Sequence, residues 1–294
     1  FWLSQINQNS NNSPIIVVQN KSDLQTSSQL NTLYLKEKYH NIENFINVSS
    51  LTNQGIDLLR KLLKKTIKSQ PNYSLKIPSK WTEIIENINQ LKVSENFITY
   101  EEFENLCVNA GVSEHSHISN ISSFLHDLGV LIHFQEDQIL KNILILDTNW
   151  ILEGIYLILD SKKIRIENGY ISIEELNNIL SDFRNLEQTI IIQIVLVFQL
   201  GFKLGKEGFL FPDGLPTNQQ INDWDFENSY KIEYHFQVIP LRFFERFIVK
   251  NHEKIIIEKT WRNGTIIKNK KGKALIVSDK FERKIKIWII ANKP

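Results

Sequence analysis

The first apolar run of the chain is a short strand that ends in a polar turn. Ile15 to Val18 are four consecutive aliphatic residues, which predicts a strand buried on both faces, as in a parallel sheet. Asn20, Lys21 and Asp23 follow within a few residues, so they lie just past the carboxyl end of that strand. Open α/β sheets bind ligands at this edge, which makes the turn the first candidate binding site.

A second apolar strand followed by a polar turn occurs over residues 45–51. Residues 45–48 are a second short apolar strand, and Ser49, Ser50 and Leu51 begin the polar turn that follows it.

Helical spacing accompanies both strands. Residues 30–39 fit one helix, and residues 56–67 place apolar side chains on one face with Arg and Lys on the other. A further apolar helix face precedes the first strand and consists of Phe1, Trp2, Leu3 and Ile6. These elements predict an α/β unit over residues 1–68.

A proline-containing linker over residues 69–78 precedes a mainly helical region over residues 79–216. The predicted helices cover residues 81–91, 99–109, 116–128 and 173–180. Two of them start with capping boxes, formed by Thr99 with Glu102 and by Ser172 with Glu175. The most apolar run, residues 190–204, predicts a buried core helix, because it is shorter than the ~20 residues of a membrane span.

The closing region, residues 217–294, is rich in β-structure. Its apolar runs predict strands over residues 230–238, 255–257, 265–267, 274–277 and 285–290. Asn263-Gly264 is a strong hairpin signal between two of these strands. Residues 240–249 predict one amphipathic helix against the sheet.

Charge is unevenly distributed, although the net charge is only +1. Residues 97–200 contain 15 acidic and 5 basic side chains, net −10, and residues 231–294 contain 16 basic and 6 acidic ones, net +10. This asymmetry predicts electrostatic docking within the molecule or between subunits, with nucleic-acid binding by the basic segment as the rival interpretation. Against the rival, Lys and Arg are scattered without an aromatic stacking motif.

The two helices and the hairpin over residues 99–146 resemble the outline of a winged helix. The helix that would read DNA, residues 113–128, contains no Lys or Arg. Because phosphate contacts supply most of the affinity for DNA, we expect no DNA binding there.

Few other chemistries fit the chain. The single cysteine, Cys107, excludes an internal disulfide and fits a reducing compartment such as the cytoplasm. His115 and His117 match no zinc spacing with Cys107, so we expect no metal site. We also predict no catalytic group and no integral membrane segment within this sequence.

Asn20-Lys21-Ser22-Asp23 resembles the guanine-recognition motif of the Ras-like GTPases. The Asp23 carboxylate can accept hydrogen bonds from the N1–H and N2–H₂ edge of guanine, which adenine does not offer. Lys21 would lie over the base, and the Asn20 amide would tie the base to neighbouring loops. Ser49-Ser50-Leu51 resembles the later turn of these proteins, whose backbone N–H groups hold the guanine O6.

A second resemblance covers most of the remaining chain. Residues 123–129 (SFLHDLG) and 145–151 (ILDTNWI) are similar to the "LHxLG … LDPxWL" signature of the COR domain, with Thr148 where proline is usual. COR follows the Roc GTPase domain in Roco proteins, the family of the leucine-rich-repeat kinases. The resemblance implies the C-terminal half of a Ras-like P-loop GTPase domain, then a helical, winged-helix-like first COR part and a β-rich second part that dimerises.

The family resemblance also implies a function. An intact relative binds GTP or GDP with Mg²⁺, hydrolyses GTP, signals through a COR-mediated dimer, and in many relatives is linked to a serine/threonine kinase domain. This sequence has no methionine and no G-x-x-x-x-G-K-[ST] phosphate loop before Asn20, so we expect a piece of a longer protein that is inactive alone. The alternative is a non-catalytic dimerisation scaffold. Its dimerisation would not depend on GDP or GTP and would weaken as the salt concentration rises.

Overall fold

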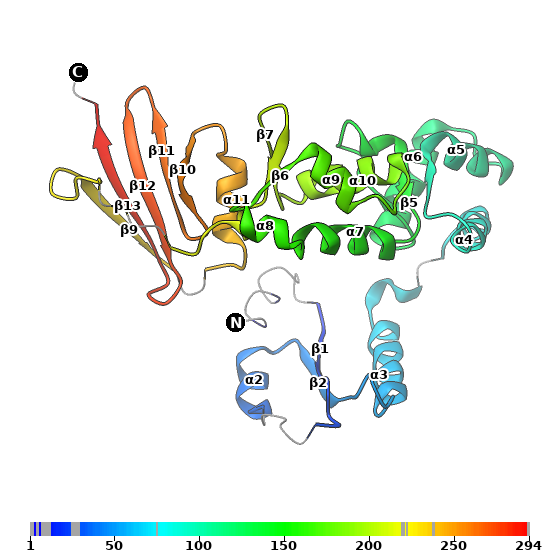
Figure 1. The fold of residues 1–294 in the computed structure, drawn as a ribbon. Helices are drawn as coiled ribbons and strands as arrows, with labels where there is room; N and C mark the ends of the chain where they lie inside the picture. The colour runs from blue at the N-terminus through cyan, green and yellow to red at the C-terminus, as the bar shows by residue number, and fades with distance from the viewer. Residues whose placement is uncertain are drawn as a thin grey trace. The chain divides into compact units, whose positions relative to one another are not determined.

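The chain folds as two structural units, Phe1–Ile77 and Pro78–Pro294 (Figure 1). Each unit has buried apolar clusters of its own. The computed structural model describes residues 3, 6, 13–24, 30–74, 76–218, 221, 223–236 and 239–292. Leu3 and Ile6 of the predicted first helix face are helical, whereas Phe1 and Trp2 lie outside the described residues.

The first unit contains a two-stranded parallel sheet. Its elements are β1 (Ile15–Gln19), α2 (Thr32–Lys38), β2 (Ile42–Asn47) and α3 (Ile56–Lys68), as the hydrophobic pattern predicts. Ile15, Tyr39 and Ile42 form its buried apolar cluster, and Ile46 and Val48 are buried as well. The structure confirms α3 as an amphipathic helix, but no residue of α3 is buried. A 3₁₀ turn, η1 (Pro71–Ser74), falls in the predicted linker.

Helices dominate the chain from Ser79 to Val197. They are α4 (Ser79–Leu91), α5 (Tyr100–Asn109), α6 (His115–Asp127), α7 (Asn149–Leu159), α8 (Lys162–Ile166), α9 (Ile173–Ile179) and α10 (Asn185–Val197). Both predicted capping boxes are present: the Thr99 hydroxyl accepts from Glu102 N, and the Ser172 hydroxyl accepts from Glu175 N. These reciprocal bonds satisfy backbone donors that would otherwise be unpaired at the start of each helix.

Two small antiparallel sheets accompany these helices. One has the order β3-β5-β4, with β3 (Phe97–Thr99), β5 (Ile143–Ile145) and β4 (Ile132–His133); the other has the order β6-β8-β7, with β6 (Tyr170–Ser172), β8 (Gly208–Leu210) and β7 (Phe202–Leu204). The 3₁₀ turns η2 (Leu140–Asn142) and η3 (Pro212–Gly214) lie between elements. The predicted hairpin over residues 130–146 is therefore present and gains β3 as a third strand.

The predicted core helix over residues 190–204 is wrong in its last part. The helix α10 ends at Val197, and Gln199 adopts a left-handed backbone with φ of 56°. Phe202 to Leu204 then form β7. Continuous apolar residues fit a buried strand as well as a buried helix, so periodicity alone could not locate this change.

Two apolar clusters fill the helical region. One packs α4, α5 and α6 together around residues such as Ile84, Phe103 and Leu125, and the other surrounds Trp150 and Ile190. Cys107 belongs to the first cluster and is fully buried, and this burial raises the pKa of its thiol to about 12.

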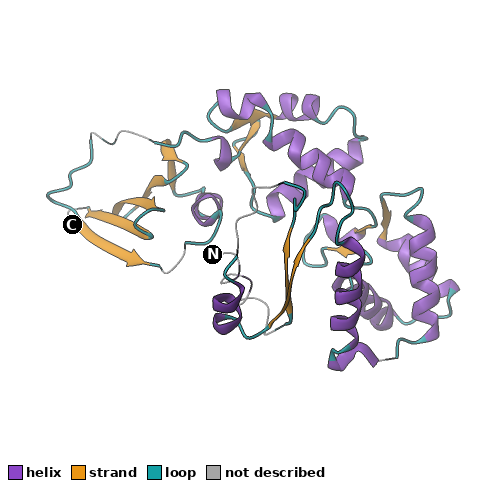
Figure 2. Cartoon of the chain, turned by 90° about the horizontal axis from the view of Figure 1, so that it is seen from below, coloured by secondary structure: helices purple, strands orange, loops and turns teal. Residues whose placement is uncertain are grey.

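The last part of the chain is a five-stranded antiparallel sheet of order β10-β11-β12-β13-β9. Its elements are β9 (Tyr230–His235), α11 (Phe243–Lys250), β10 (Ile255–Trp261), β11 (Gly264–Asn269), β12 (Gly272–Asp279) and β13 (Lys284–Ala291). One face packs on α11 through Phe244 and Ile248, and the opposite face holds Trp224 and Trp261. Within this second unit the five-stranded sheet and α11 lie at the C-terminal end, and the helices α4 to α10 lie away from it with the two small sheets (Figure 1 and Figure 2).

The predicted mixture of helical and β-rich parts is confirmed. The finer assignments, to half of a Ras-like domain and to a winged helix, stay predictions, and so do the bounds of the four predicted segments.

Candidate functional site

The two candidate turns lie at the same edge of the parallel sheet. β1 and β2 run side by side in parallel, with Gln19 opposite Asn47 at their carboxyl ends. Beyond them the chains stay bonded, because Val48 N donates to Gln19 O at 2.9 Å and Ser22 N donates to Val48 O at 3.0 Å. The turn after each strand therefore begins beside the other.

Asn20 connects the two turns directly. Its Oδ1 accepts hydrogen bonds from Ser50 N at 3.0 Å, from Ser50 Oγ at 3.2 Å and from Lys21 N at 2.8 Å. An exposed amide that binds a partner 30 residues away fixes the distance between the two loops.

Lys21 and Asp23 have the freedom that a ligand-binding pair needs. Lys21 adopts a left-handed backbone with φ of 62°, and its carbonyl accepts from Leu24 N at 3.0 Å, which forms a tight turn. Both side chains are exposed. The Asp23 carboxylate accepts no hydrogen bond from any residue that the structure describes, so its oxygens are available to a ligand.

Hydrogen bonds among its own residues stabilise the second turn, which begins at Ser49. Ser49 is fully buried; its N–H donates to Gln54 O at 2.9 Å, and its Oγ accepts from Thr52 N at 3.2 Å. Ser50 N is bonded to Asn20. Leu51 is 85% exposed, and among the three predicted backbone donors its N–H alone has no partner in the described part of the chain.

Gly55 brings α3 close to the site. It caps α3 with φ of 76°, and a Cβ at this position would lie 2.5 Å from Asn47 O at the end of β2. A larger residue would therefore push α3 away from the second turn.

The sequence predicts no metal site at Cys107, His115 and His117, and the structure shows the surroundings of Cys107 and His115. In the described ranges, no group of three or more His, Cys, Asp or Glu side chains could hold a metal ion. His115 is exposed and its Nδ1 lies 3.0 Å from Glu104 Oε1, while Cys107 is buried. These residues are thus ordinary surface and core side chains.

Sequence reasoning missed a buried polar cluster around His133. Its Nδ1 lies 2.5 Å from Ser122 Oγ, its Nε2 lies 2.7 Å from Lys141 O, and its ring stacks on Tyr100. Burial lowers the pKa of His133, and the nearby His126 acts in the same direction, although the contact with Lys141 O opposes them. A histidine inside the apolar run of residues 131–134 was the available signal. Both ring nitrogens are occupied, so the cluster joins α6, β4 and η2.

Comparison with protein families identifies the second unit. The family model "C-terminal of Roc, COR-A domain" matches residues 78–215, and "C-terminal of Roc, COR-B domain" matches residues 227–294. A solved structure of Methanosarcina barkeri Roco2 RocCORdC bound to GDP is 32% identical, covers 73% of this chain and 68% of that chain, and has a TM-score of 0.57. The chain is therefore a GTPase-associated COR module. It belongs to the Roco family of Roc-COR proteins.

Curated relatives place the same segment in larger proteins. A Roc-COR-CHAT protease of Runella zeae is 27% identical over 92% of this chain and 30% of its own length. A probable serine/threonine-protein kinase, pats1 of Dictyostelium discoideum, is 25% identical over 92% of this chain and 9% of its own length. The chain thus spans less than a third of either relative. Across the described residues, no helix is long and apolar enough to cross a membrane.

Proposed function

We propose that residues 1–68 supply the base-recognition part of a guanine-nucleotide site in a Roc domain. Asp23 accepts from the N1–H and N2–H₂ groups of guanine, and the Lys21 stem lies over the base. Asn20 sets the spacing of the loops. In the turn of Ser49, Ser50 and Leu51, the Leu51 N–H is the donor that the described residues leave free for the guanine O6, because the other two are bonded within the protein. The observation that carries this proposal is the Asn20 contact with Ser50 at 3.0 Å, which joins the two turns at one sheet edge.

The intact protein would bind GTP and GDP and hydrolyse GTP. No G-x-x-x-x-G-K-[ST] loop occurs in this sequence, so the groups that bind the phosphates and Mg²⁺ would come from outside it. The GDP bound to the Roco2 relative supports nucleotide binding. This chain alone is then a recognition and coupling segment without catalytic groups.

The COR parts would couple nucleotide state to assembly. We assign residues 69–78 to a linker, 79–216 to the first COR part and 217–294 to a second part that forms a homodimer. The charges of −10 over residues 97–200 and +10 over residues 231–294 support electrostatic docking between these parts or between subunits.

The base-reading role of Asp23 is testable in an intact protein that contains this chain. Asp23→Asn should lower the affinity for GDP roughly a hundredfold, because a neutral amide cannot accept from both guanine donors. The same variant should gain affinity for xanthosine diphosphate, because the new amide N–H₂ can donate to the xanthine O2. Calorimetric titration with each nucleotide measures both effects.

Asp57→Asn is the matched control. Asp57 is an exposed carboxylate in the first turn of α3 that contacts only Arg60 among the described residues, and its loss should leave GDP affinity unchanged. Unchanged GDP affinity in Asp23→Asn, or equal losses in both variants, would contradict the proposed site.

A further inference from the structure

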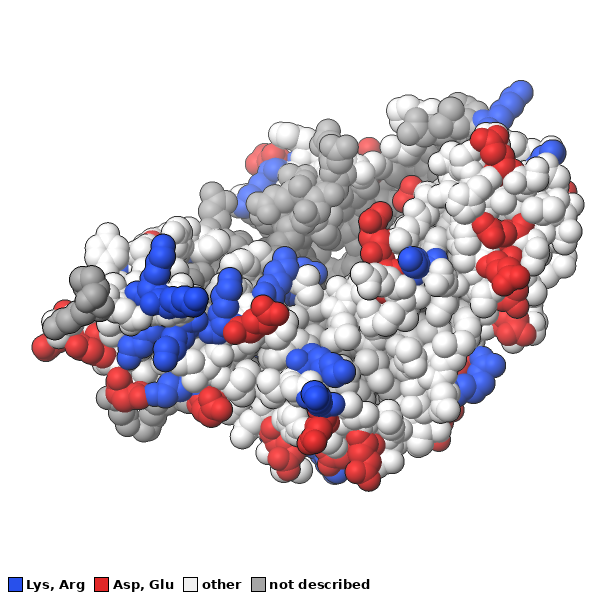
Figure 3. All heavy atoms as spheres, turned by 90° about the horizontal axis from the view of Figure 1, so that it is seen from above, with Lys and Arg blue, Asp and Glu red and all other residues white. Residues whose placement is uncertain are grey.

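Five exposed lysines gather at one end of the five-stranded sheet. This lysine end consists of Lys254 before β10, Lys268 in β11, Lys270 and Lys271 in the turn, and Lys273 in β12. Lys268 and Lys273 are direct cross-strand partners, and Lys268 N donates to Lys254 O at 2.9 Å. Figure 3 shows Lys and Arg side chains gathered over this sheet, at the left of the view.

Ion pairs do not balance this cluster in the described chain, although Asp223 and Asp225 lie within electrostatic reach of Lys273. Like charges directly opposite each other on neighbouring strands repel. No described carboxylate forms an ion pair with any of the five lysines. Asp223 lies near Lys273 but is paired with Lys259, and Asp225 is bonded to Asn228. Lys273 itself lies over the Trp224 ring, 5.0 Å from its centroid.

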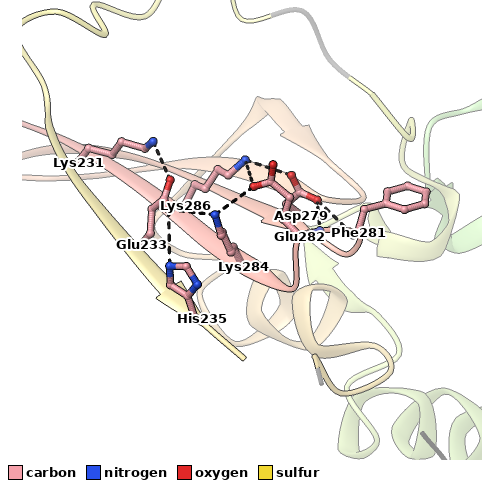
Figure 4. A network of polar contacts seen from close by, with 8 residues as sticks. All are labelled: Lys231, Glu233, His235, Asp279, Phe281, Glu282, Lys284 and Lys286. Atoms are coloured by element: carbon pink, nitrogen blue, oxygen red, sulfur yellow. Dashed lines mark hydrogen bonds and ion pairs between the residues drawn. The ribbon is translucent and has the colours of Figure 1, made fainter. Parts of the chain in front are cut away.

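The opposite end of the sheet shows that the same strands can balance their charges. There the direct cross-strand partners have opposite charges, Asp279 with Lys284 and Glu233 with Lys286. Figure 4 shows Lys286 between Asp279 at 3.1 Å and Glu282 at 2.9 Å. The excess of positive charge is therefore a property of the lysine end alone and not of the whole sheet.

A shallow apolar hollow adjoins the lysine end. Its volume is about 370 Å³, and four of the five lysines line it. Ile267, Ala274 and Ile289 are apolar residues of its wall, and Ile289 is 37% exposed. This end of the sheet therefore combines five cations with one exposed apolar side chain, Ile289, and positive charge together with apolar surface is typical of protein segments that lie on a membrane surface.

We propose that the lysine end binds the surface of a membrane that contains anionic lipids. All five cations are lysine, whose hydrated ammonium group is attracted to a charged surface without a fixed geometry. Nucleic-acid surfaces add arginine forks or exposed aromatic platforms, whereas the aromatic ring nearest to these lysines, Trp224, is buried.

Sedimentation of the full chain with lipid vesicles tests the proposal. The chain should bind vesicles of phosphatidylcholine with phosphatidylserine at physiological ionic strength, bind vesicles of pure phosphatidylcholine far less, and dissociate at high salt. The triple variant K268Q, K271Q and K273Q should lose about a hundredfold in affinity, since each lysine near an anionic surface contributes about fivefold. These side chains are exposed, so thermal unfolding should show an intact fold.

A matched control distinguishes binding through the lysine end from a general effect of the chain's positive charge. The triple variant K61Q, K64Q and K65Q removes the same charge from three exposed lysines of α3 and should retain binding within a few-fold. Equal losses in both triple variants, loss only in the α3 variant, or no vesicle binding by the wild-type chain overturns the proposal. Tighter binding to a single-stranded RNA oligonucleotide than to the vesicles, at the same salt, also overturns it. None of these outcomes depends on nucleotide binding.

Discussion

The two ends of the five-stranded sheet differ in how they manage charge. At the lysine end, Lys268 faces Lys273 across neighbouring strands. At the other end, which we call the paired end, three lysines and three carboxylates alternate: Lys231, Glu233, Asp279, Glu282, Lys284 and Lys286. The strands β12 and β13 extend to both ends, so strand geometry does not explain the difference.

The hairpin turns at the two ends use the same hydrogen bonds with different charges. Asn269 Oδ1 accepts from Lys271 N at 2.8 Å and from Gly272 N at 3.0 Å. Asp279 Oδ1 accepts from Phe281 N at 3.1 Å and Glu282 N at 3.0 Å. Either oxygen satisfies the turn, which needs an acceptor and not a charge. The comparison teaches that the fold of each turn requires a hydrogen-bond acceptor at this position, and that the net charge of each end of the sheet does not follow from this requirement.

The largest effect should come from removing Asp279. Asp279→Ala deletes the acceptor of two turn N–H groups and one ion-pair partner of Lys286, and should destabilise the protein by about 1–2 kcal/mol in urea unfolding. Asn269→Ala removes the same two hydrogen bonds without an ion pair, so it should cost about half as much. Equal losses would show that the ion pair contributes nothing.

A smaller effect should follow from the charge of Asp279 alone. Donation from Glu282 N, assisted by Lys286, holds the pKa of Asp279 below its ordinary value of 3.8 although its partial burial opposes this. A carboxyl with a lowered folded pKa stabilises the fold fully above its unfolded pKa, and this stability is lost as pH falls through the folded pKa. Asp279→Asn should therefore cost less than about 1 kcal/mol at neutral pH and nothing in acid.

Urea unfolding of the wild type and Asp279→Asn over a pH series checks this expectation. The two curves of stability against pH should converge below the folded pKa of Asp279. A difference that stays constant down to the most acidic pH would show that the turn geometry, and not the charge, makes the contribution.

The smallest effect should be a gain in stability at the lysine end. Lys268→Glu converts a like-charged cross-strand pair into an opposite-charged pair with Lys273, which should stabilise the protein by about 0.5 kcal/mol. Lys270→Glu changes net charge equally but lies in the turn, without a strand partner, and should change stability less. Thermal unfolding of both variants measures the difference, and a loss of stability in Lys268→Glu would remove the argument that this end carries unrelieved repulsion.

Local signals in the sequence predicted local structure well. The capping boxes of Thr99 and Ser172 occur where the sequence places them, because both partners lie three residues apart. The hairpin at Asn263-Gly264 is also confirmed, but for another reason than the usual one. Neither residue has the positive φ that this dipeptide normally supplies; instead, a Cβ at Gly264 would collide with the Trp261 ring.

Long-range pairing was beyond local signals. β3 pairs with β5 although Phe97 and Ile145 are 48 residues apart, and β9 closes the large sheet against β13 and not against a sequence neighbour. The role of Asn20 came from a family resemblance, and its contact with Ser50 is visible only in the structure. His133 was missed because one polar residue in an apolar strand does not reveal which groups surround it.

The burial of Cys107 has a practical consequence. It is the chain's single thiol, fully buried, and at neutral pH almost none of it exists as the thiolate that alkylating reagents attack. Alkylation of Cys107 therefore requires that α5 separates from the core that it shares with α4 and α6. The rate of that reaction therefore measures how often the COR-A core opens transiently. A single cysteine introduced at an exposed position would be labelled selectively, because the native cysteine does not react while the core is closed.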